Sequence, residues 1–299
     1  MPETNPTVVV LTALALEYAA VRSHLTDRVE HVHPEGTRVE LGRLDGTPWT
    51  VAVAELGEGA VATAALTTRI ASWLRPQAVF FVGIAGSLKS DIGIGDVVVG
   101  TKVYGIHGGK QTSKGFLVRP EAWPASHALV QATRSAVRDM PDVRAHFKPI
   151  AAGDVVLADS RSDIARHLRE HYNDAAAIEM EGSGAAHAAH LDGQLDALVI
   201  RGISDLADAR KSAADQGGSQ QRAAAQAASV AMAALRKHRP RADSSGARGD
   251  LRRGSDGGPG GAFADGPVYH GDHIDFSNGT FLGPVVGKTT RGDRAPRGE

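Results

Sequence analysis

The chain has no cysteine, few aromatic residues and almost no net charge. The absence of cysteine excludes a disulfide scaffold, a thiolate nucleophile and a cysteine-based zinc site. Aromatic residues make up 5% of the 299 residues, and the formal net charge is -1. A nearly neutral chain has no global field that would attract nucleic acid or an anionic membrane, so we expect neither as a partner.

Long hydrophobic runs are missing as well. The run from Val8 to Leu16 is interrupted by Thr12 and is too short to cross a bilayer. The first seven residues contain one acid and two prolines but no basic residue, which is not the pattern of a secretory signal. These features predict a cytoplasmic protein.

Strand-like and helix-like segments alternate over most of the chain. Short apolar runs predict buried strands at 8–11, 78–82, 97–104, 147–152, 175–180 and 196–200. Helical spacing is found at 14–25, 60–73, 126–140, 162–171, 181–191 and 219–237. A turn signal at 44–47 joins strands 37–44 and 49–54 into a hairpin. This order predicts one α/β domain, residues 6–238, around a mixed sheet.

Three segments do not follow the alternation. Residues 105–124 are polar and long for a connection without structure, which predicts a lid or a subunit contact. Residues 239–266 consist mainly of Gly, Arg, Asp, Ser and Pro and are predicted to be a disordered linker. Apolar residues return at 267–288, where Asn278-Gly279 predicts a hairpin that needs a partner, because an isolated hairpin is marginal in water.

Carboxylic acids stand near the ends of several predicted strands: Glu17, Glu179, Glu181 and Asp205. In open α/β sheets, ligands bind beyond the carboxyl ends of strands, so these acids are expected to line one cleft. A partly dry Asp205 could donate a proton, or it could cap the next helix. Glu17 could equally be a solvated acid at a helix start. One acid for ligand hydroxyls, one for water and one for a leaving group suit the cleavage of an N-ribosidic bond.

Other motifs carry weaker signals. The glycine-rich segment 83–87 lets the backbone approach a ligand, or it serves a tight strand–helix junction. It lacks the spacing of a dinucleotide-binding loop. His187 and His190 are three residues apart on a predicted helix, but their alanine-rich surroundings favour a packed or solvated face over a metal site. No metal ligand set is predicted.

Six motifs occur together in the order and spacing of a known family: Ala13-Leu14-Ala15-Leu16-Glu17, Val82-Gly83-Ile84-Ala85-Gly86, Gly95-Asp96-Val97-Val98, Gly153-Asp154, Ile178-Glu179-Met180-Glu181 and Ile203-Ser204-Asp205-Leu206-Ala207-Asp208. With them, residues 6–238 resemble the nucleoside phosphorylase superfamily, and especially its 5'-methylthioadenosine/S-adenosylhomocysteine nucleosidases. The resemblance implies a three-layer α/β/α sandwich around a mixed, partly barrel-like sheet, usually oligomeric, with no metal or organic cofactor.

The resemblance also implies residue roles. Asp205 matches the acid that protonates the purine N7, with Ser204 supporting it, and Glu17 matches the carboxylate that positions water. Arg201 matches the residue that orients this network. Glu181 matches the ligand of the ribose hydroxyls, and Met180 packs on the sugar. The remaining residues that the resemblance places around the substrate are Glu179, Val156, Leu157, Gly83, Ile84, Ala85 and Gly86.

Three positions depart from the family pattern. Phosphorylases hold phosphate with an arginine and a serine where this chain has Phe81 and Ile84, so water is the expected nucleophile and phosphorolysis the alternative. Val156 replaces an aromatic residue that commonly flanks adenine, which leaves the base open. The substrate is therefore expected to be a purine nucleoside or a related nucleotide.

A second hypothesis concerns the end of the chain. The segment 107–124 resembles versions of this domain in multidomain signalling proteins, and residues 267–288 resemble the amyloid-like motifs of some bacterial effectors. A matching motif on a partner would template cross-β stacking there. The chain would then be a signalling or defence effector whose nucleoside-cleaving domain is recruited by its tail.

Overall fold

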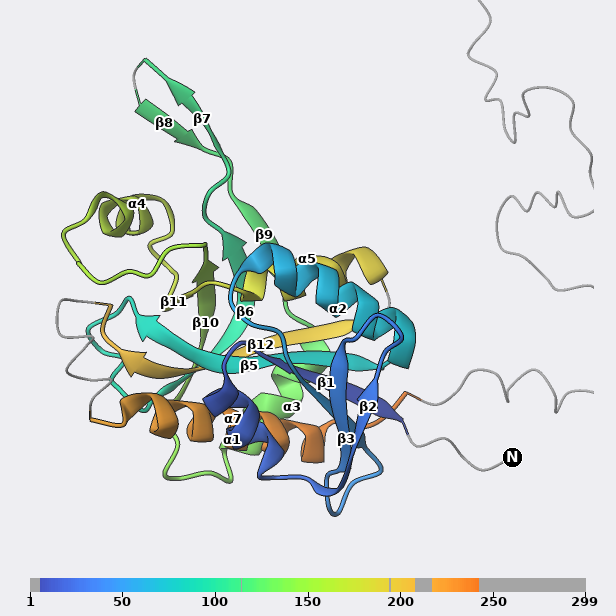
Figure 1. Cartoon of the computed structure of the whole chain (residues 1–299). Coiled ribbons are helices and arrows are strands. Elements are labelled where there is room, and N and C mark those ends of the chain that lie inside the picture. Colours follow the sequence, from blue (N-terminus) through green and yellow to red (C-terminus); the bar gives the residue numbers. More distant parts are fainter. Residues whose placement is uncertain (1–5, 114, 194, 208–216, 242–299) are drawn as a thin grey trace, which may run out of the picture. The chain divides into compact units, whose positions relative to one another are not determined.

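The computed structural model describes residues 6–113, 115–193, 195–207 and 217–241 (Figure 1). The predicted interaction motif at 267–288 lies outside the described residues, and so does the predicted linker at 239–266 apart from its first three residues. Among the described residues, no helix combines the length and the apolar character that a membrane span requires.

Strands and helices alternate in the described chain as the hydrophobic pattern predicts. The strands are β1 (Thr7–Thr12), β2 (Thr26–Val32), β3 (Arg38–Arg43), β4 (Thr50–Glu55), β5 (Ala78–Ser87), β6 (Val97–Gly105), β7 (Gly109–Thr112), β8 (Gly115–Val118), β9 (Glu121–Pro124), β10 (Ala145–Ala152), β11 (Ala177–Glu179) and β12 (Asp196–Asp205). The helices are α1 (Ala15–Arg22), α2 (Ala60–Leu74), α3 (His127–Val137), α4 (Asp163–His171), α5 (Gly182–Asp192) and α7 (Ser219–Lys237).

One mixed sheet organises the domain. Its strand order is β11-β10-β6-β12-β5-β1-β4-β3-β2, and β9 adds to β6. Because β11 also pairs antiparallel with β5, through Ala177 and Ser87, one half of the sheet closes on itself. The prediction of a mixed, partly barrel-like sheet is confirmed, and the closure brings the ends of β5, β11 and β12 together.

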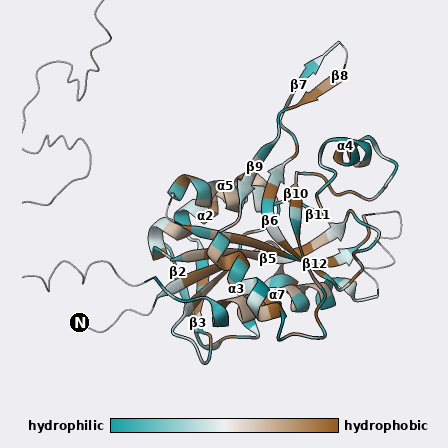
Figure 2. Cartoon of the chain, turned by 180° about the vertical axis from the view of Figure 1, so that it is seen from behind, coloured by the Kyte–Doolittle hydropathy of each residue, from teal (hydrophilic) through white to brown (hydrophobic). Residues whose placement is uncertain are grey.

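Helices cover both faces of the sheet, as the three-layer prediction requires. Successive strand residues point to opposite faces, so Val8 and Val10 pack in one core while Val9 and Leu11 pack in the other. Helices α1, α3 and α7 contribute to the first core, and α2 and α5 to the second (Figure 1). Figure 2 shows the central strands, such as β5, among the most apolar parts of the chain.

Small residues bring α7 close to the sheet. A Cβ added to Gly202 on β12 would lie 1.9 Å from the carbonyl oxygen of Ala223 on α7. Six alanines of α7 are buried against this face, at positions 223, 224, 227, 228, 231 and 234. The alanine-rich pattern that predicted this helix therefore also sets the distance between helix and sheet.

Three details of the strand prediction are wrong. Strand β5 does not end at Val82 but continues through the glycine-rich segment to Ser87, because β12 and β11 pair with it there. Strand β12 likewise continues to Asp205. Strand β2 was not predicted, because its seven residues are all exposed and carry no alternation of apolar and polar side chains.

The polar segment 105–124 has regular structure of its own. It forms the hairpin β7–β8 and then β9, which pairs antiparallel with β6. Phe116 and Leu117 on β8 are exposed, and Figure 1 shows the hairpin extending away from the sheet. The interpretation of this segment as a lid or a subunit contact stays a prediction.

Candidate active site

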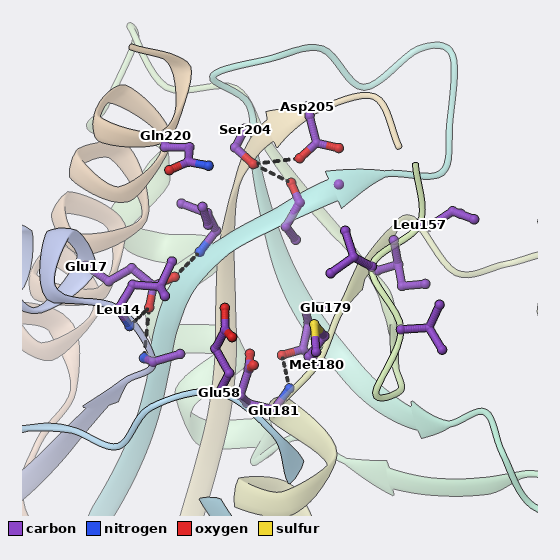
Figure 3. Close-up of a pocket in the computed structure, with 17 residues that line it drawn as sticks. Leu14, Glu17, Glu58, Leu157, Glu179, Met180, Glu181, Ser204, Asp205 and Gln220 are labelled. Carbon is purple, nitrogen blue, oxygen red and sulfur yellow. Dashed lines mark hydrogen bonds between the residues drawn. The ribbon is translucent and has the colours of Figure 1, made fainter. Parts of the chain in front are cut away.

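A pocket opens where β1, β5, β11 and β12 end (Figure 3). It is lined by Ala13, Leu14, Glu17, Glu58, Ile84, Ala85, Gly86, Val155, Val156, Leu157, Ile178, Glu179, Met180, Glu181, Ser204, Asp205 and Gln220. Most of the candidate residues chosen from the sequence are thus brought to one pocket, although they come from distant parts of the chain.

Glu17 is buried at the start of α1, so its interpretation as a solvated acid is wrong. One carboxylate oxygen, Oε2, accepts hydrogen bonds from the backbone N–H groups of Ala13, at 2.8 Å, and Leu14, at 3.0 Å. The other, Oε1, accepts one from the N–H of Ile84 at 2.8 Å. Glu17 therefore joins the beginning of the helix to β5 and has a fixed place in the pocket.

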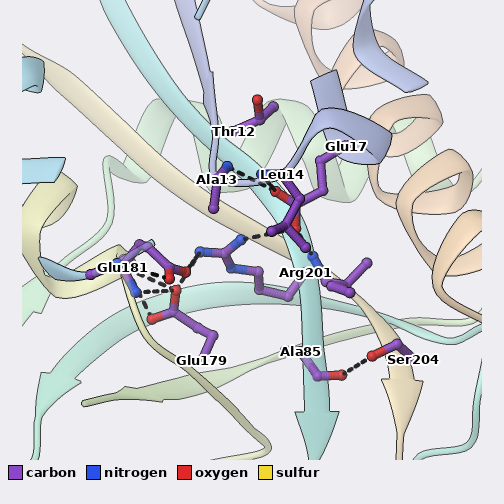
Figure 4. Close-up of polar contacts among 12 residues, drawn as sticks. Thr12, Ala13, Leu14, Glu17, Ala85, Glu179, Glu181, Arg201 and Ser204 are labelled. Atoms are coloured by element: carbon purple, nitrogen blue, oxygen red, sulfur yellow. Dashed lines mark hydrogen bonds and ion pairs between the residues drawn. The ribbon is translucent and has the colours of Figure 1, made fainter. Parts of the chain in front are cut away.

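Arg201 lies behind the pocket on β12 and is fully buried (Figure 4). Its guanidinium forms an ion pair with Glu179, and Nη2 lies 3.7 Å from Oε2 of Glu181. Nη1 lies 4.0 Å from Oε1 of Glu17, and the group stacks 4.4 Å from the ring centre of Phe81. Burial alone would lower the pKa of Arg201, but the carboxylates around it outweigh burial and raise it.

Glu179 connects this cluster to helix α5. Its carboxylate accepts hydrogen bonds from the N–H of Glu181, at 3.1 Å, and from the N–H of Gly182, at 2.7 Å. The first turn of a helix has free N–H groups and favours negative charge, so Glu179 stabilises the start of α5 as well as Arg201. A Cβ on Gly182 would lie 2.8 Å from the same carboxylate, which explains a glycine there.

Glu181 shares one cation with two other acids. Burial raises the pKa of the Glu181 carboxyl to about 7; Arg201 acts in the opposite direction, and Glu179 and Glu17 raise the pKa further. The N–H of Gly59 donates a hydrogen bond to Oε1 at 3.2 Å, which orients the side chain toward the pocket. Glu181 therefore changes protonation near neutral pH, where it can accept hydrogen bonds from hydroxyl groups once ionised.

Gly83 was predicted to bind substrate, but it does not line the pocket. A Cβ at this position would lie 2.1 Å from Nη1 of Arg201 and 2.4 Å from Oε1 of Glu17. Neither group can move far, because both are buried among their partners. Glycine is required here so that Arg201 and Glu17 can lie against the backbone of β5.

Asp205 stands at the other end of the pocket, at the end of β12. Its carboxyl group is buried, and it accepts hydrogen bonds from the Ser204 hydroxyl and from the N–H of Ala207, both at 2.9 Å. Ala207 has a φ of 49°, so the backbone leaves the extended conformation just after the end of β12. A Cβ on Gly86 would lie 2.9 Å from the same carboxyl group, so glycine makes room for it.

Two pocket residues with polar side chains were missed in the sequence. Gln220 comes from the first turn of α7, which carries no chemical motif. Glu58 lies between Gly57 and Gly59, which have φ values of 79° and 101°. In the sequence, Glu58 is an acid in a glycine-containing loop before a helix, and nothing in that pattern marks it as a pocket residue.

The two histidines of α5, His187 and His190, are both exposed. The ring of His187 stacks on Trp123, with centres 5.1 Å apart. Among the described residues, no group of three or more His, Cys, Asp or Glu side chains has the arrangement that holds a metal ion.

Comparison with known proteins gives the pocket a context. The family model described as "Phosphorylase superfamily" matches residues 7–236. A 5'-methylthioadenosine/S-adenosylhomocysteine nucleosidase from Exiguobacterium sp. is 30% identical over 210 residues, which are 67% of this chain and 84% of the relative. The enzyme of the same name from Chromohalobacter salexigens is 29% identical over 209 residues, with the same coverage of both chains.

Solved structures agree with the sequence comparison. The MTA/SAH nucleosidase of Streptococcus pneumoniae, in complex with 8-aminoadenine, superposes with a TM-score of 0.67 and 25% identity. The match covers 77% of this chain and 99% of that one. The two chains therefore share their fold.

Proposed function

Because the chain belongs to the phosphorylase superfamily, we propose that it hydrolyses the N-ribosidic bond of a purine nucleoside of the methylthioadenosine or adenosylhomocysteine type. The observation that carries this proposal is the convergence of Glu17, Glu181 and Asp205 in one pocket, with Arg201 buried behind it. These groups come from three separate parts of the chain, namely α1, the start of α5 and β12, and together they can serve a base, a ribose and a water molecule.

The chemical step uses one acid at each end of the pocket. Asp205 donates a proton to N7 of the base while the bond between C1' and N9 breaks, and the bonding electrons leave with the base. Ser204 holds the Asp205 carboxyl group in place through its 2.9 Å hydrogen bond. The sugar becomes cationic at C1', and a water molecule positioned by Glu17 attacks this carbon and gives up a proton to the carboxylate.

The remaining buried groups bind and orient the sugar. Glu181 accepts hydrogen bonds from the ribose hydroxyls, and Met180 packs against the ring. Arg201 keeps Glu17, Glu179 and Glu181 in one arrangement, and its charge makes three neighbouring carboxylates tolerable in a buried space. Arg201 and Glu179 are therefore positioning residues, because neither needs to touch the reacting atoms.

Several features favour water over phosphate as the nucleophile. Phe81 is buried under the Arg201 guanidinium, and Ile84 offers its backbone N–H to Glu17. No Lys, Arg or His side chain is among the described residues that line the pocket, whereas five of them are acids. A phosphate ion would be repelled by the ionised acids and would find no cationic side chain among these residues, so phosphorolysis is the less favoured alternative.

We also propose that the protein is a homo-oligomer. Val61 on α2 and Leu191 on α5 are 82% and 75% exposed, and both helices belong to the same outer layer. Self-association would cover such large apolar side chains. Light scattering coupled to size exclusion measures the subunit number, and a monomer at micromolar concentration would contradict this part of the proposal.

A substrate screen tests the reaction. Methylthioadenosine, adenosine, inosine and AMP are incubated with the protein, each with and without phosphate, and base release is followed by chromatography. We expect base and free sugar without phosphate. Formation of a sugar 1-phosphate only when phosphate is added would favour the phosphorylase alternative, and no base release from any compound would overturn the proposal.

The variant Asp205→Asn tests the assignment of the acid. It keeps the shape of the side chain but removes the proton donor, so we expect kcat to fall by about a hundredfold to ten-thousandfold. An unchanged circular dichroism spectrum and thermal midpoint would show that the loss is chemical. Full activity of this variant would mean that another group protonates the base.

A further inference from the structure

Glu58 is the carboxyl group in the pocket that the proposed mechanism leaves without a task. It lines the pocket and is exposed, and its carboxylate forms no hydrogen bond or ion pair within the described part of the chain. Figure 3 draws Glu58 and Glu181 in the same part of the pocket, and the residue after Glu58, Gly59, donates its backbone N–H to Glu181. We propose that Glu58 selects the substrate by the charge of its 5' substituent: it favours a cationic group, such as an ammonium, and it disfavours a phosphate.

The backbone around Glu58 is built to hold it in this place. Gly57 and Gly59 have positive φ values, a conformation that other residues adopt only at a cost, so the tight loop depends on both of them. The loop is anchored on one side by the N–H of Leu56, which donates to the carbonyl oxygen of Thr12 at 2.8 Å. On the other side, the N–H of Gly59 donates to Glu181. Glu58 therefore points into the pocket from a loop that is fixed at both ends.

The position of Glu58 relative to the other acids indicates which part of a nucleoside it faces. Figure 3 shows Glu58 and Asp205 at opposite ends of the pocket, with Glu58 beside Glu181. The inference rests on the proposed function, in which Asp205 meets the base and Glu181 meets the ribose hydroxyls. In ribose, C1' carries the base and C4' carries the 5' carbon on the other side of the ring oxygen. The 5' substituent therefore extends away from Asp205, toward Glu58.

The balance of charges in the pocket indicates which charge the 5' substituent should carry. Arg201 is already surrounded by Glu17, Glu179 and Glu181, so its positive charge is shared among three carboxylates. Glu58 adds another negative charge, at the open end, with no cation from the described residues to balance it. An ammonium on the 5' carbon would supply the missing positive charge, whereas a phosphate would add to the repulsion. Since Glu58 is exposed, we expect about a fivefold effect on kcat/KM.

A series of nucleosides that differ only at the 5' position tests this inference. With adenine as the base, the series is 5'-amino-5'-deoxyadenosine, adenosine and AMP, whose substituents are cationic, neutral and anionic at neutral pH. If the substrate screen finds another base released faster, the same series is made on that base. We expect kcat/KM to fall in the order amino, hydroxyl, phosphate, and the order to weaken at high salt because the effect is electrostatic.

Variants of Glu58 separate its role from the shape of the loop. In Glu58→Gln, the ratio of kcat/KM for the amino compound to that for adenosine should fall by about fivefold, and in Glu58→Lys the preference should reverse toward the phosphate. Glu55→Gln is the matched control, because Glu55 is an exposed glutamate three residues earlier that does not line the pocket, and its ratios should equal those of the wild type.

The outcomes distinguish the inference from the proposed function. Base release without dependence on the 5' charge would overturn the inference and leave the proposed function standing, and so would a charge preference that survives Glu58→Gln. No base release from any member of the series would overturn the proposed function, and the inference with it. The inference is supported if Glu58→Lys prefers the phosphate compound over the amino compound while Glu55→Gln keeps the wild-type ratios of kcat/KM.

Discussion

The pocket has an inner end, which is its buried floor, and an outer end, which is its exposed rim. The two differ in how their side chains are held. At the inner end, Glu17, Glu179 and Arg201 are buried, and each is fixed by several hydrogen bonds or ion pairs. At the outer end, Glu58 and Val156 are exposed, and only the backbone of their loops sets their positions. The inner end can maintain one geometry for bond cleavage, while the outer end can change with little cost to the fold.

The difference has a physical origin. A buried network of charges is stable only when every member is present, since a charge left without its partner keeps its full desolvation cost. An exposed side chain is solvated whether or not it has a partner, so its replacement costs little. Substitutions at the inner end should therefore change stability and activity together, and substitutions at the outer end should change substrate preference alone.

The largest expected effect follows removal of the central cation. Arg201→Met keeps an unbranched apolar side chain but removes the guanidinium, which leaves three buried carboxylates without their shared cation. We expect the free energy of unfolding to fall by about 3–5 kcal/mol. Urea titration followed by circular dichroism measures this, and kcat should fall as well, because Glu17 and Glu181 would move apart.

A surface pair provides the comparison for this variant. Lys237, the last residue of α7, forms a 2.8 Å ion pair with Asp139, and both side chains are exposed. Lys237→Met should lower the free energy of unfolding by less than about 1 kcal/mol, because exposed ion pairs contribute little. Equal losses of unfolding free energy in the two variants would mean that the buried cluster contributes no more to stability than a surface ion pair, which would contradict the difference between the two ends.

A medium effect is expected from the protonation of Glu181. Its pKa is about 7 in the folded protein against an ordinary value of 4.5, so between these values the folded state binds more protons than the unfolded state. This contribution is unfavourable above the folded pKa, and it disappears as the pH falls below 4.5. The free energy of unfolding should therefore decrease by about 3 kcal/mol as pH rises through this window.

Glu181→Gln tests this pH dependence. The difference in unfolding free energy between wild type and variant should change with pH between 4.5 and 7, and become constant outside it. Substrate binding gives a second readout, because only the ionised carboxylate accepts two ribose hydroxyls: KM of the wild type should fall as pH rises toward 7, and this dependence should vanish in the variant. Parallel stability curves for the two proteins would contradict the assignment.

The contrast between the two ends also explains what the sequence could predict. Apolar runs such as residues 8–11 and 78–82 identify the buried strands, because burial on both faces leaves only apolar side chains. Asp205 stands out because an acid ends such a run. The inner end could be predicted to this extent, since burial leaves a pattern in the sequence.

Contacts across the chain leave no such pattern. The reason for glycine at position 83 is the space taken by Arg201, which lies 118 residues later in a neighbouring strand. Glu58 is an ordinary acid in a glycine-rich loop until the fold places it beside Glu181. The exposed strand β2 could not be predicted either, because none of its residues is buried in a core and its sequence therefore has no apolar pattern.

The smallest expected effect concerns Val156, which is 59% exposed at the outer end of the pocket and which the resemblance to the nucleosidases matches to an aromatic residue beside the base. Val156→Phe would offer a ring for stacking on the purine, which is worth about 1 kcal/mol, so KM should fall about fivefold with kcat nearly unchanged. Val29→Phe is the matched control, because Val29 on β2 is 57% exposed and does not line the pocket. A change in kcat rather than KM would mean that position 156 acts on the bond cleavage itself, and that the outer end is not separate from the chemistry.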